Sequence, residues 1–251
     1  MRVVLMMLII VGTWDIAEAR IFRFGSESLA GYFAGTGSLS SVGDDAYAKT
    51  SGADTVFDKE PGYNYSGEVG LLFNSQNFAV LFGIEFLSPQ KMQLGGLSSG
   101  GTKYMDMTSN IRATILKMGS RIAITSSDTY RSYISGHVGY AMMSLENTYE
   151  LTAAGQTQYS LPANLSLEGE ANVIMGGIGM GIEFNIADTS TMSLEGGYRY
   201  LPVSSWEHKN SGTGFNGAYT KGDNIKTQSG EDLETELSGM YIGIGFQIYI
   251  N

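Results

Sequence analysis

Cysteine is absent from this 251-residue chain, and proline occurs only four times. Without cysteine the chain has no disulfide to stabilise it and no thiol or Cys-metal chemistry. Positive charge is also scarce, because 15 Lys and Arg stand against 25 Asp and Glu, a net charge of −10. Nucleic acid is therefore not expected as a partner. The 34 glycines follow no Gly-X-Y period, which excludes a collagen-like fibre.

Long hydrophobic runs are missing as well. The apolar run at residues 3–11 falls well below the roughly 20 residues that a membrane-spanning helix needs. It follows Arg2 and precedes Ala17-Glu18-Ala19, which is the pattern of a secretory signal peptide over residues 1–19. Residues 20–251 are expected to form one domain. An exported chain without a spanning helix can cross a membrane only as a closed β-barrel.

What the chain has instead is a two-residue alternation of side chains. Between Ile174 and Ile186 the large apolar residues share one face, and glycines with Glu183 occupy the other. After a turn at residues 187–190 the alternation resumes as far as Tyr200. The pattern predicts a long antiparallel hairpin. A face of glycine and sparse charge is typical of the inside of a barrel in lipid, with the apolar face outside.

Six similar segments complete the prediction. The eight expected strands cover residues 20–37, 63–73, 78–87, 104–116, 129–147, 174–186, 192–200 and 240–250. Their connections alternate between long and short. This predicts an all-β fold, an eight-stranded antiparallel up-and-down transmembrane β-barrel with four long outer loops and short periplasmic turns. A soluble lipocalin-like barrel would need apolar side chains inside, the reverse of these faces.

Some facings are expected and others stay open. In the fourth strand, which could extend into residues 117–128, the apolar residues are expected outside and Arg112 inside. The facing of the first strand stays open because its alternation is poor. Aromatic girdles are expected at both rims. The candidates are Tyr65, Tyr104, Tyr149, Tyr200 and Trp206 at the outer rim, and Phe73, Phe78, Phe184 and Tyr249 at the inner rim.

The segments LEGGYRY at residues 194–200 and YIGIGFQIYI at residues 241–250, with the alternating strands, resemble the small outer-membrane β-barrel superfamily of Gram-negative bacteria, the OmpA/OmpX-like proteins. The resemblance implies a location in the bacterial outer membrane, surrounded by lipid and lipopolysaccharide, and insertion by the barrel assembly machinery. The chain departs from the usual terminal aromatic residue, since it ends in Tyr249-Ile250-Asn251.

Charged residues are expected inside the barrel. By the two-residue period the inward set is Glu68, Glu85, Arg112, Arg131, His137, Glu183, Glu195 and Arg199. Eight strands leave an interior just wide enough for side chains, and carboxylates there need charged or hydrogen-bonding partners. We therefore expect a salt-bridge network that fills the lumen. The alternative is a proton or ion path, or a gate that opens when Glu–Arg pairs exchange.

The long loops hold much of the Gly, Ser, Asn and Tyr of the chain, a composition suited to adaptable contacts. They predict a structural or adhesin-like surface role, with a surface or host ligand bound through the loops. A narrow pore for small or hydrophobic solutes is the alternative.

A lipid-modifying enzyme is the third class of function, because some eight-stranded outer-membrane proteins resemble acyltransferases or lipid A deacylases. Such chemistry needs a base beside a nucleophile. His137 is expected deep in the lumen and His208 lies in the longest loop, and neither forms a recognisable catalytic pair. No catalytic residue, cofactor or metal is therefore expected, and the pairs Asp44-Asp45 and Glu231-Asp232 are interpreted as solvated loop charge.

Overall fold

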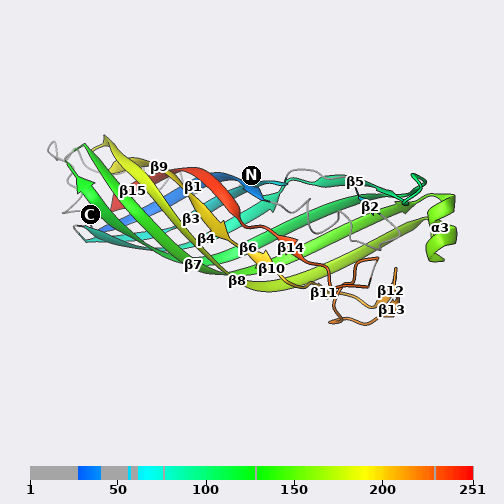
Figure 1. Cartoon of the computed structure of the whole chain (residues 1–251). Helices are drawn as coiled ribbons and strands as arrows, with labels where there is room; N and C mark the ends of the chain where they lie inside the picture. Colours follow the sequence, from blue (N-terminus) through cyan, green and yellow to red (C-terminus); the bar gives the residue numbers. More distant parts are fainter. Residues whose placement is uncertain are drawn as a thin grey trace, which may run out of the picture.

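A computed structural model describes residues 28–40, 56–57, 62–75, 77–127, 129–228 and 230–250. Eight long antiparallel strands form a closed ring (Figure 1). In order around the ring they are β1 (Leu29–Ser40), β3 (Gly62–Ser75), β4 (Phe78–Pro89), β6 (Lys103–Ser126), β7 (Tyr130–Leu151), β8 (Asn164–Ala187), β9 (Ser190–Tyr200) and β15 (Gly239–Ile250). The predicted eight-stranded barrel is confirmed. The predicted signal peptide, residues 1–19, lies outside the described residues.

The ring closes between the first and last strands. Leu29 lies opposite Ile250, and the pairing continues without a shift to Ser38 and Tyr241. On the outer side of this seam the rings of Phe33 and Phe246 stack with centroids 5.2 Å apart. Phe33 is exposed whereas Tyr32 is buried, which settles the facing of the first strand.

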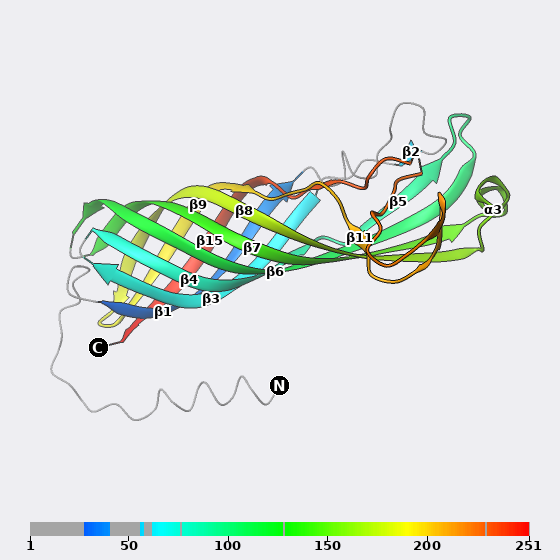
Figure 2. The same cartoon turned by 90° about the horizontal axis from the view of Figure 1, so that it is seen from below.

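Three of the strands are about twice as long as the others. β6, β7 and β8 have 24, 22 and 24 residues, against 12 in β1 and β4. They run on past the ring as an open sheet, which we call the external extension (Figure 2). Strands β5 (Met92–Leu97) and β2 (Val56–Phe57) join one edge of this sheet, and β11 (Glu207–His208) joins the other.

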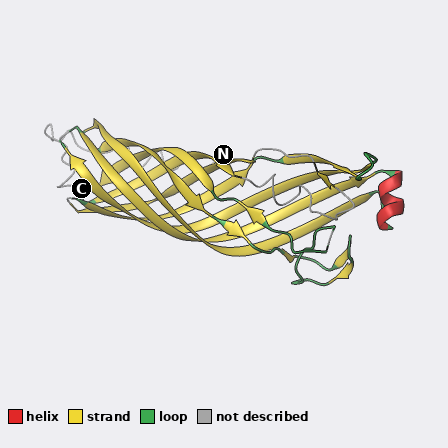
Figure 3. Ribbon diagram, viewed as in Figure 1, coloured by secondary structure: helices red, strands yellow, loops and turns green. Residues whose placement is uncertain are grey.

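The far end of the extension carries the one helix among the described residues, α3 (Ala153–Tyr159), shown in red in Figure 3. It caps the β7–β8 hairpin, and the hydroxyl of Thr152 accepts a hydrogen bond from the Gly155 amide at 3.2 Å. No helix in the described part of the chain is long and apolar enough to cross a membrane.

Much of residues 88–102 and 148–167 forms strand or helix, although these residues fall in the expected long loops.

The extension has a hydrophobic core, which continues into the barrel as far as Ile115 and Met175. The segment that joins β9 to β15 contains the short strands β10 (Pro202–Val203), β12 (Gly212–Gly214), β13 (Gly217–Tyr219) and β14 (Thr235–Glu236). It packs Trp206, Ile225 and Leu233 against the same cluster that holds Met105 and Leu145 of the sheet. Trp206 is fully buried, and its indole N–H donates to Thr235 Oγ1 at 3.1 Å.

Along β6, β7 and β8 the apolar face changes sides at one level. Thr114, Met142 and Asn172 lie opposite one another across the three strands, and we call them the border row. On the short-turn side of this row the large apolar residues point outward and are exposed. They include Leu116, Met118, Ile134, Val138, Ile174, Ile178 and Met180. On the far side, apolar residues of the opposite parity are buried inside the extension, namely Met105, Met107, Ile111, Leu145, Leu165 and Leu167.

The predicted facing of the fourth strand is therefore wrong. Met105, Met107 and Ile111 are buried and Arg112 is exposed. The cause is a change in the surrounding medium. Beyond the border row the outside of the sheet faces water, so apolar side chains gather on its inner face, as in a soluble sheet.

On the short-turn side of the border row, exposed apolar side chains form a continuous belt around the barrel. On β8 it runs from Ile174 to Ile186, about 40 Å along the strand, or about 28 Å along the barrel axis at a strand tilt near 45°. This matches the apolar band of about 25 Å on barrels that span a lipid bilayer. Soluble monomeric proteins rarely expose an apolar surface of this extent.

The predicted aromatic girdles are partly wrong. Tyr65 and Tyr200 are exposed, as are the three phenylalanines at the inner rim, Phe73, Phe78 and Phe184. Trp206 and Tyr149 are instead buried in the core of the extension, and Tyr249 is buried in the lumen. Trp206 and Tyr149 lie beyond the border row, where burial in a protein core replaces contact with lipid headgroups.

Candidate functional site

The lumen is filled by polar layers, and the layer nearest the short turns surrounds Glu183. The Arg131 guanidinium pairs with Glu183 Oε2 at 2.6 Å and donates to Asn74 Oδ1 at 2.7 Å. The other carboxylate oxygen, Oε1, accepts hydrogen bonds from Thr191 at 2.5 Å and Tyr249 at 3.0 Å. Both oxygens of a fully buried carboxylate are thus satisfied, as burial of a charge requires.

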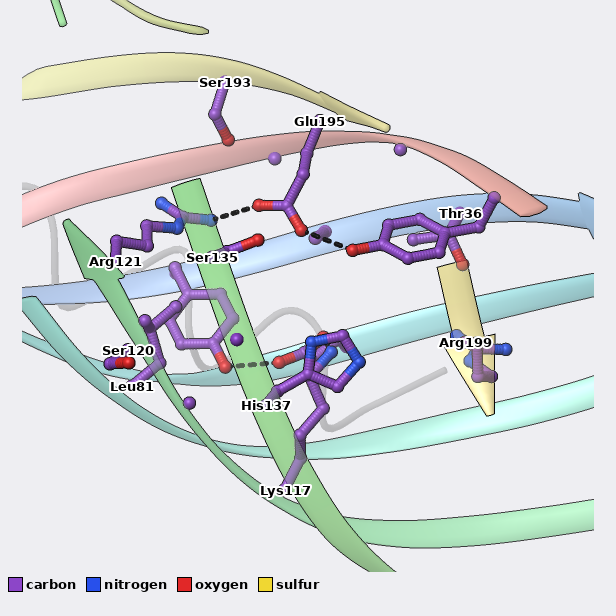
Figure 4. A pocket seen from close by; sticks show the side chains of 18 of the residues that line it. Thr36, Leu81, Lys117, Ser120, Arg121, Ser135, His137, Ser193, Glu195 and Arg199 are labelled. Carbon is purple, nitrogen blue, oxygen red and sulfur yellow. Dashed lines mark hydrogen bonds and ion pairs between the residues drawn. The ribbon is translucent and has the colours of Figure 1, made fainter. Parts of the chain in front are cut away.

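The next layer surrounds Glu195. Its carboxylate accepts hydrogen bonds from the hydroxyls of Tyr241 at 2.7 Å and Tyr133 at 3.0 Å. Arg121 lies 3.6 Å from Glu195 and places its guanidinium 4.5 Å from the centroid of the Tyr133 ring. Figure 4 shows Arg121 and Glu195 facing each other across the lumen.

The third layer holds two carboxylates and two cations. The Nζ of Lys117 lies 2.5 Å from Oε2 of Glu68 and 3.4 Å from Oε2 of Glu85. Glu85, which is fully buried, also pairs with Arg199. Tyr32 donates a hydrogen bond to Glu68. Shared cations of this kind hold like charges together that would otherwise repel each other.

The charges of these layers balance. Four carboxylates, Glu68, Glu85, Glu183 and Glu195, face four cations, Lys117, Arg121, Arg131 and Arg199, which gives 4 − 4 = 0. The prediction that Arg112 faces the lumen is wrong, since Arg112 is exposed on the outer face of the extension. The others lie inside, and His137 faces the lumen beside the Tyr241 ring, with centroids 6.3 Å apart.

Two lumen cations, Lys117 and Arg121, were missed. A signal for them exists in the sequence, because Lys117, Gly119 and Arg121 alternate with outward residues at Met118 and Ile122. This alternation was overlooked because residues 117–128 were predicted as a connection between strands. Continued toward the amino terminus, the same alternation places Arg112 on the outer face.

The space left among the layers is small. A cavity of about 60 Å³ lies between His137, Lys117, Arg121, Glu195 and Arg199 (Figure 4). That is room for a few water molecules. Toward the extension the interior becomes apolar. A Cβ on Gly139 would meet Ile115 at 2.9 Å and Met175 at 3.2 Å, so these two side chains fill the barrel there.

A second concave site, the external pocket, lies on the extension. It has a volume of about 410 Å³ and is lined by the segment that joins β9 to β15 together with Leu167. His208 is buried in its wall, and its ring stacks on Tyr219 with centroids 3.6 Å apart. Burial lowers the pKa of His208, and the Asp223 carboxylate opposes this shift. Within the described residues, no group of His, Asp and Glu is arranged to hold a metal ion.

Comparisons with known proteins find likeness in the fold alone. No protein-family model and no curated protein matches the chain. Among solved structures, Neisserial surface protein A is 6% identical, with a TM-score of 0.42 over 89% of this chain and 100% of that one. OprG of Pseudomonas aeruginosa is 12% identical, with a TM-score of 0.42 over 91% and 100%. Ail, the attachment invasion locus protein of Yersinia pestis, is 12% identical, with a TM-score of 0.39 over 88% and 99%.

These three structures are small outer-membrane β-barrels. The expected resemblance to that class is confirmed at the level of the fold.

Proposed function

We propose that this protein resides in the bacterial outer membrane and acts through the external extension, which presents a surface to ligands outside the cell. The observation that carries the proposal is the change of apolar face at the border row. Such a change is expected where lipid gives way to water, and the β6–β8 sheet continues beyond it for about 35 Å of strand, from Thr114 to Lys103.

The extension is preorganised for binding. Fully buried residues such as Trp206, Met105 and Leu145 hold the joining segment against the sheet. A surface that is ordered before its ligand arrives loses less conformational entropy on binding than a flexible loop does. This supports a surface-interaction role more than a role in which the chain only fills the membrane.

The proposed placement implies further partners. Outer-membrane lipid and lipopolysaccharide would surround the apolar belt, and the barrel assembly machinery would insert the chain after export directed by residues 1–19. The amino terminus of the protein recovered from outer membranes tests the export step. We expect sequencing to begin at Arg20, and a chain that still begins at Met1 would contradict cleavage.

A surface role is tested by shortening the extension without touching the barrel. Residues 148–166 are replaced by Asn-Gly, which joins the paired residues Asn147 of β7 and Leu167 of β8 by a two-residue turn. We expect the shortened chain to reach the membrane and to remain heat-modifiable on a gel, while adherence of the expressing cells to cultured epithelial cells falls to that of cells without the protein. Undiminished adherence would contradict the proposal.

A narrow pore is the second candidate, and the cavity beside His137 is the observation in its favour. Against it, any path must pass the Glu85–Arg199 pair and then the apolar layer of Ile115 and Met175. We expect the refolded, heat-modifiable protein to be silent in planar bilayers. Reproducible single-channel currents would move the function to transport.

A further inference from the structure

Asp223 is the charged residue of the external pocket that no ion pair neutralises within the described part of the chain. Its Oδ2 accepts hydrogen bonds from the backbone N–H and the hydroxyl of Thr220, at 2.7 and 2.8 Å, whereas its Oδ1 accepts none from the described residues. These two bonds lower the pKa of Asp223, so the carboxylate stays ionised. Asp223 is exposed, and a bound molecule can therefore reach its free oxygen.

Two amide side chains of the pocket wall also keep an acceptor oxygen. Asn216 Nδ2 donates to the backbone oxygen of Thr227 at 2.7 Å, and Asn224 Nδ2 donates to Asp232 Oδ2 at 3.1 Å. Both partner oxygens can only accept, so the orientation of each amide is fixed. The amide oxygens of Asn216 and Asn224, which are both exposed, thus remain available to a ligand that donates hydrogen bonds.

The charges around the pocket sum to a negative value. Lys226 lies in an ion pair with Asp232, so that Asp223, Lys226 and Asp232 together give −1 + 1 − 1 = −1. The whole segment that joins β9 to β15, residues 201–238, has three basic and six acidic residues, which gives 3 − 6 = −3. A cleft lined by negative charge attracts cations.

Phe215 gives the pocket an apolar wall. The ring is half-buried and contacts Tyr149 and Tyr159 edge to face, with centroids 4.9 and 5.1 Å apart. These contacts hold the ring in place. An aromatic ring beside a carboxylate suits a cation carried on an alkyl chain, because the ring attracts the cation and the chain packs on apolar surface.

We propose that the external pocket binds the cationic side chain of an Arg or Lys of a protein outside the cell. Its charged group lies at Asp223 and its alkyl stem lies on Phe215. The oxygens of Asn216 and Asn224 accept further N–H groups, of which guanidinium and ammonium ions have several. The volume of about 410 Å³ accommodates such a side chain. The proposal rests on the proposed function, since it names the ligand class of the extension.

Saturation-transfer NMR tests the proposal on the refolded full barrel in a non-ionic detergent at physiological ionic strength. The probes are the N-acetyl methylamides of arginine, lysine and citrulline, and the polyamine putrescine. Citrulline has the shape of arginine without its charge. We expect the arginine and lysine derivatives to bind, and the citrulline derivative to bind about tenfold more weakly than the arginine derivative. No binding of the two cationic derivatives overturns the proposal, as does equal binding of arginine and citrulline.

Asp223→Asn tests the position of the site. It removes the charge but keeps an oxygen that can accept from Thr220, and it should weaken the binding of the arginine derivative about tenfold. The matched control is Glu231→Gln, which removes one negative charge from an exposed residue of the same segment that does not line the pocket. We expect this control to bind as the wild type does. Equal weakening by both variants would assign the binding to the general charge of the segment and overturn the pocket.

A second variant keeps the test decisive if Asp223→Asn unfolds the segment, which the fluorescence of Trp206 reports. Asn224→Ala removes one of the acceptor oxygens at an exposed residue. It should also weaken the binding of the arginine derivative. An unchanged affinity in this variant would overturn the proposal.

The outcome is separable from that of the adherence experiment. Adherence that needs the extension, without binding of the cationic derivatives, removes the cation site and leaves the surface role. Binding of the derivatives, with adherence that the shortened extension does not change, does the reverse. The source of the cation follows from putrescine. A higher affinity for putrescine than for either derivative assigns the site to a free polyamine, and a lower affinity assigns it to a protein side chain.

Discussion

Glu85 shows what the lumen demands of single residues. Its side chain is fully buried, with Arg199 on one side and Lys117 at 3.4 Å on the other. Charges inside a protein are tolerated only when paired, and removal of one partner leaves an uncompensated charge. The balance of four carboxylates with four cations follows from this constraint.

Replacing Arg199 with Ala should therefore destabilise the barrel by about 3–5 kcal/mol. Urea unfolding of the protein folded into lipid vesicles measures this. Arg112→Ala is the control, because Arg112 is an exposed arginine on the outer face, where such changes stay within about 0.5 kcal/mol. Equal effects of the two substitutions would show that the lumen network does not stabilise the fold.

His208 gives the extension a pH dependence. Burial lowers its pKa below the ordinary value of 6.5, against the opposing effect of Asp223, while its ring lies on Tyr219. Well above pH 6.5 the imidazole is neutral whether the segment is folded or not. As the pH falls below 6.5, the unfolded segment takes up a proton that the folded one resists, so stability is lost.

We expect the segment around His208 to unfold at lower urea concentration at pH 5.5 than at pH 8. Trp206, the one tryptophan in residues 20–251, reports this through its fluorescence. His208→Phe should flatten the dependence between these two pH values. A dependence that survives in this variant must arise from another group.

At the scale of single strands, the decisive feature is the reversal of the apolar face in β6, β7 and β8. A strand has one side-chain period, but the medium outside it changes from lipid to water at the border row. The same outward parity therefore carries Ile174 and Met180 on one side of Asn172, and Glu168 and Glu170 on the other.

The depth of a charge along β8 tests the position of the border row. Met180→Arg puts a charge near the middle of the belt and should lower the free energy of unfolding by about 2–4 kcal/mol. Asn172→Arg puts a charge at the border row and should lower it by less than about 1 kcal/mol. Unfolding in vesicles compares the two. If Asn172→Arg costs as much as Met180→Arg, lipid reaches beyond the border row.

The whole molecule combines a closed barrel with an open sheet. Every strand of the barrel is paired on both sides, whereas the extension ends in β2 and β11, each two residues long. Regions with exposed strand edges can open before the rest of a protein does. The extension and the barrel are thus expected to differ in stability.

Urea should therefore unfold the molecule in two steps. The fluorescence of Trp206 follows the core of the extension, and heat-modifiability on a gel follows the barrel. We expect the fluorescence change to come at lower urea, so that the two curves do not coincide. Coincident curves would mean that the extension and the barrel form one cooperative unit.

The sequence by itself determined the strand number, the order of long and short connections, and the facing of four strands whose outer faces meet lipid from end to end. The belt residues on β3, β4, β9 and β15 obey one rule along their length, so local alternation was sufficient. The inward position of Glu68, Glu85, Glu183 and Glu195 followed from the same period.

Only the tertiary structure decided where lipid ends and what covers the extension. Met105 is covered by the segment of Trp206, which lies more than 90 residues away along the chain. His208 and Phe215 likewise line one pocket only after that segment folds onto the sheet. Local alternation records which side of a strand is apolar, but burial is a property of the surroundings, and these are assembled by long-range contacts.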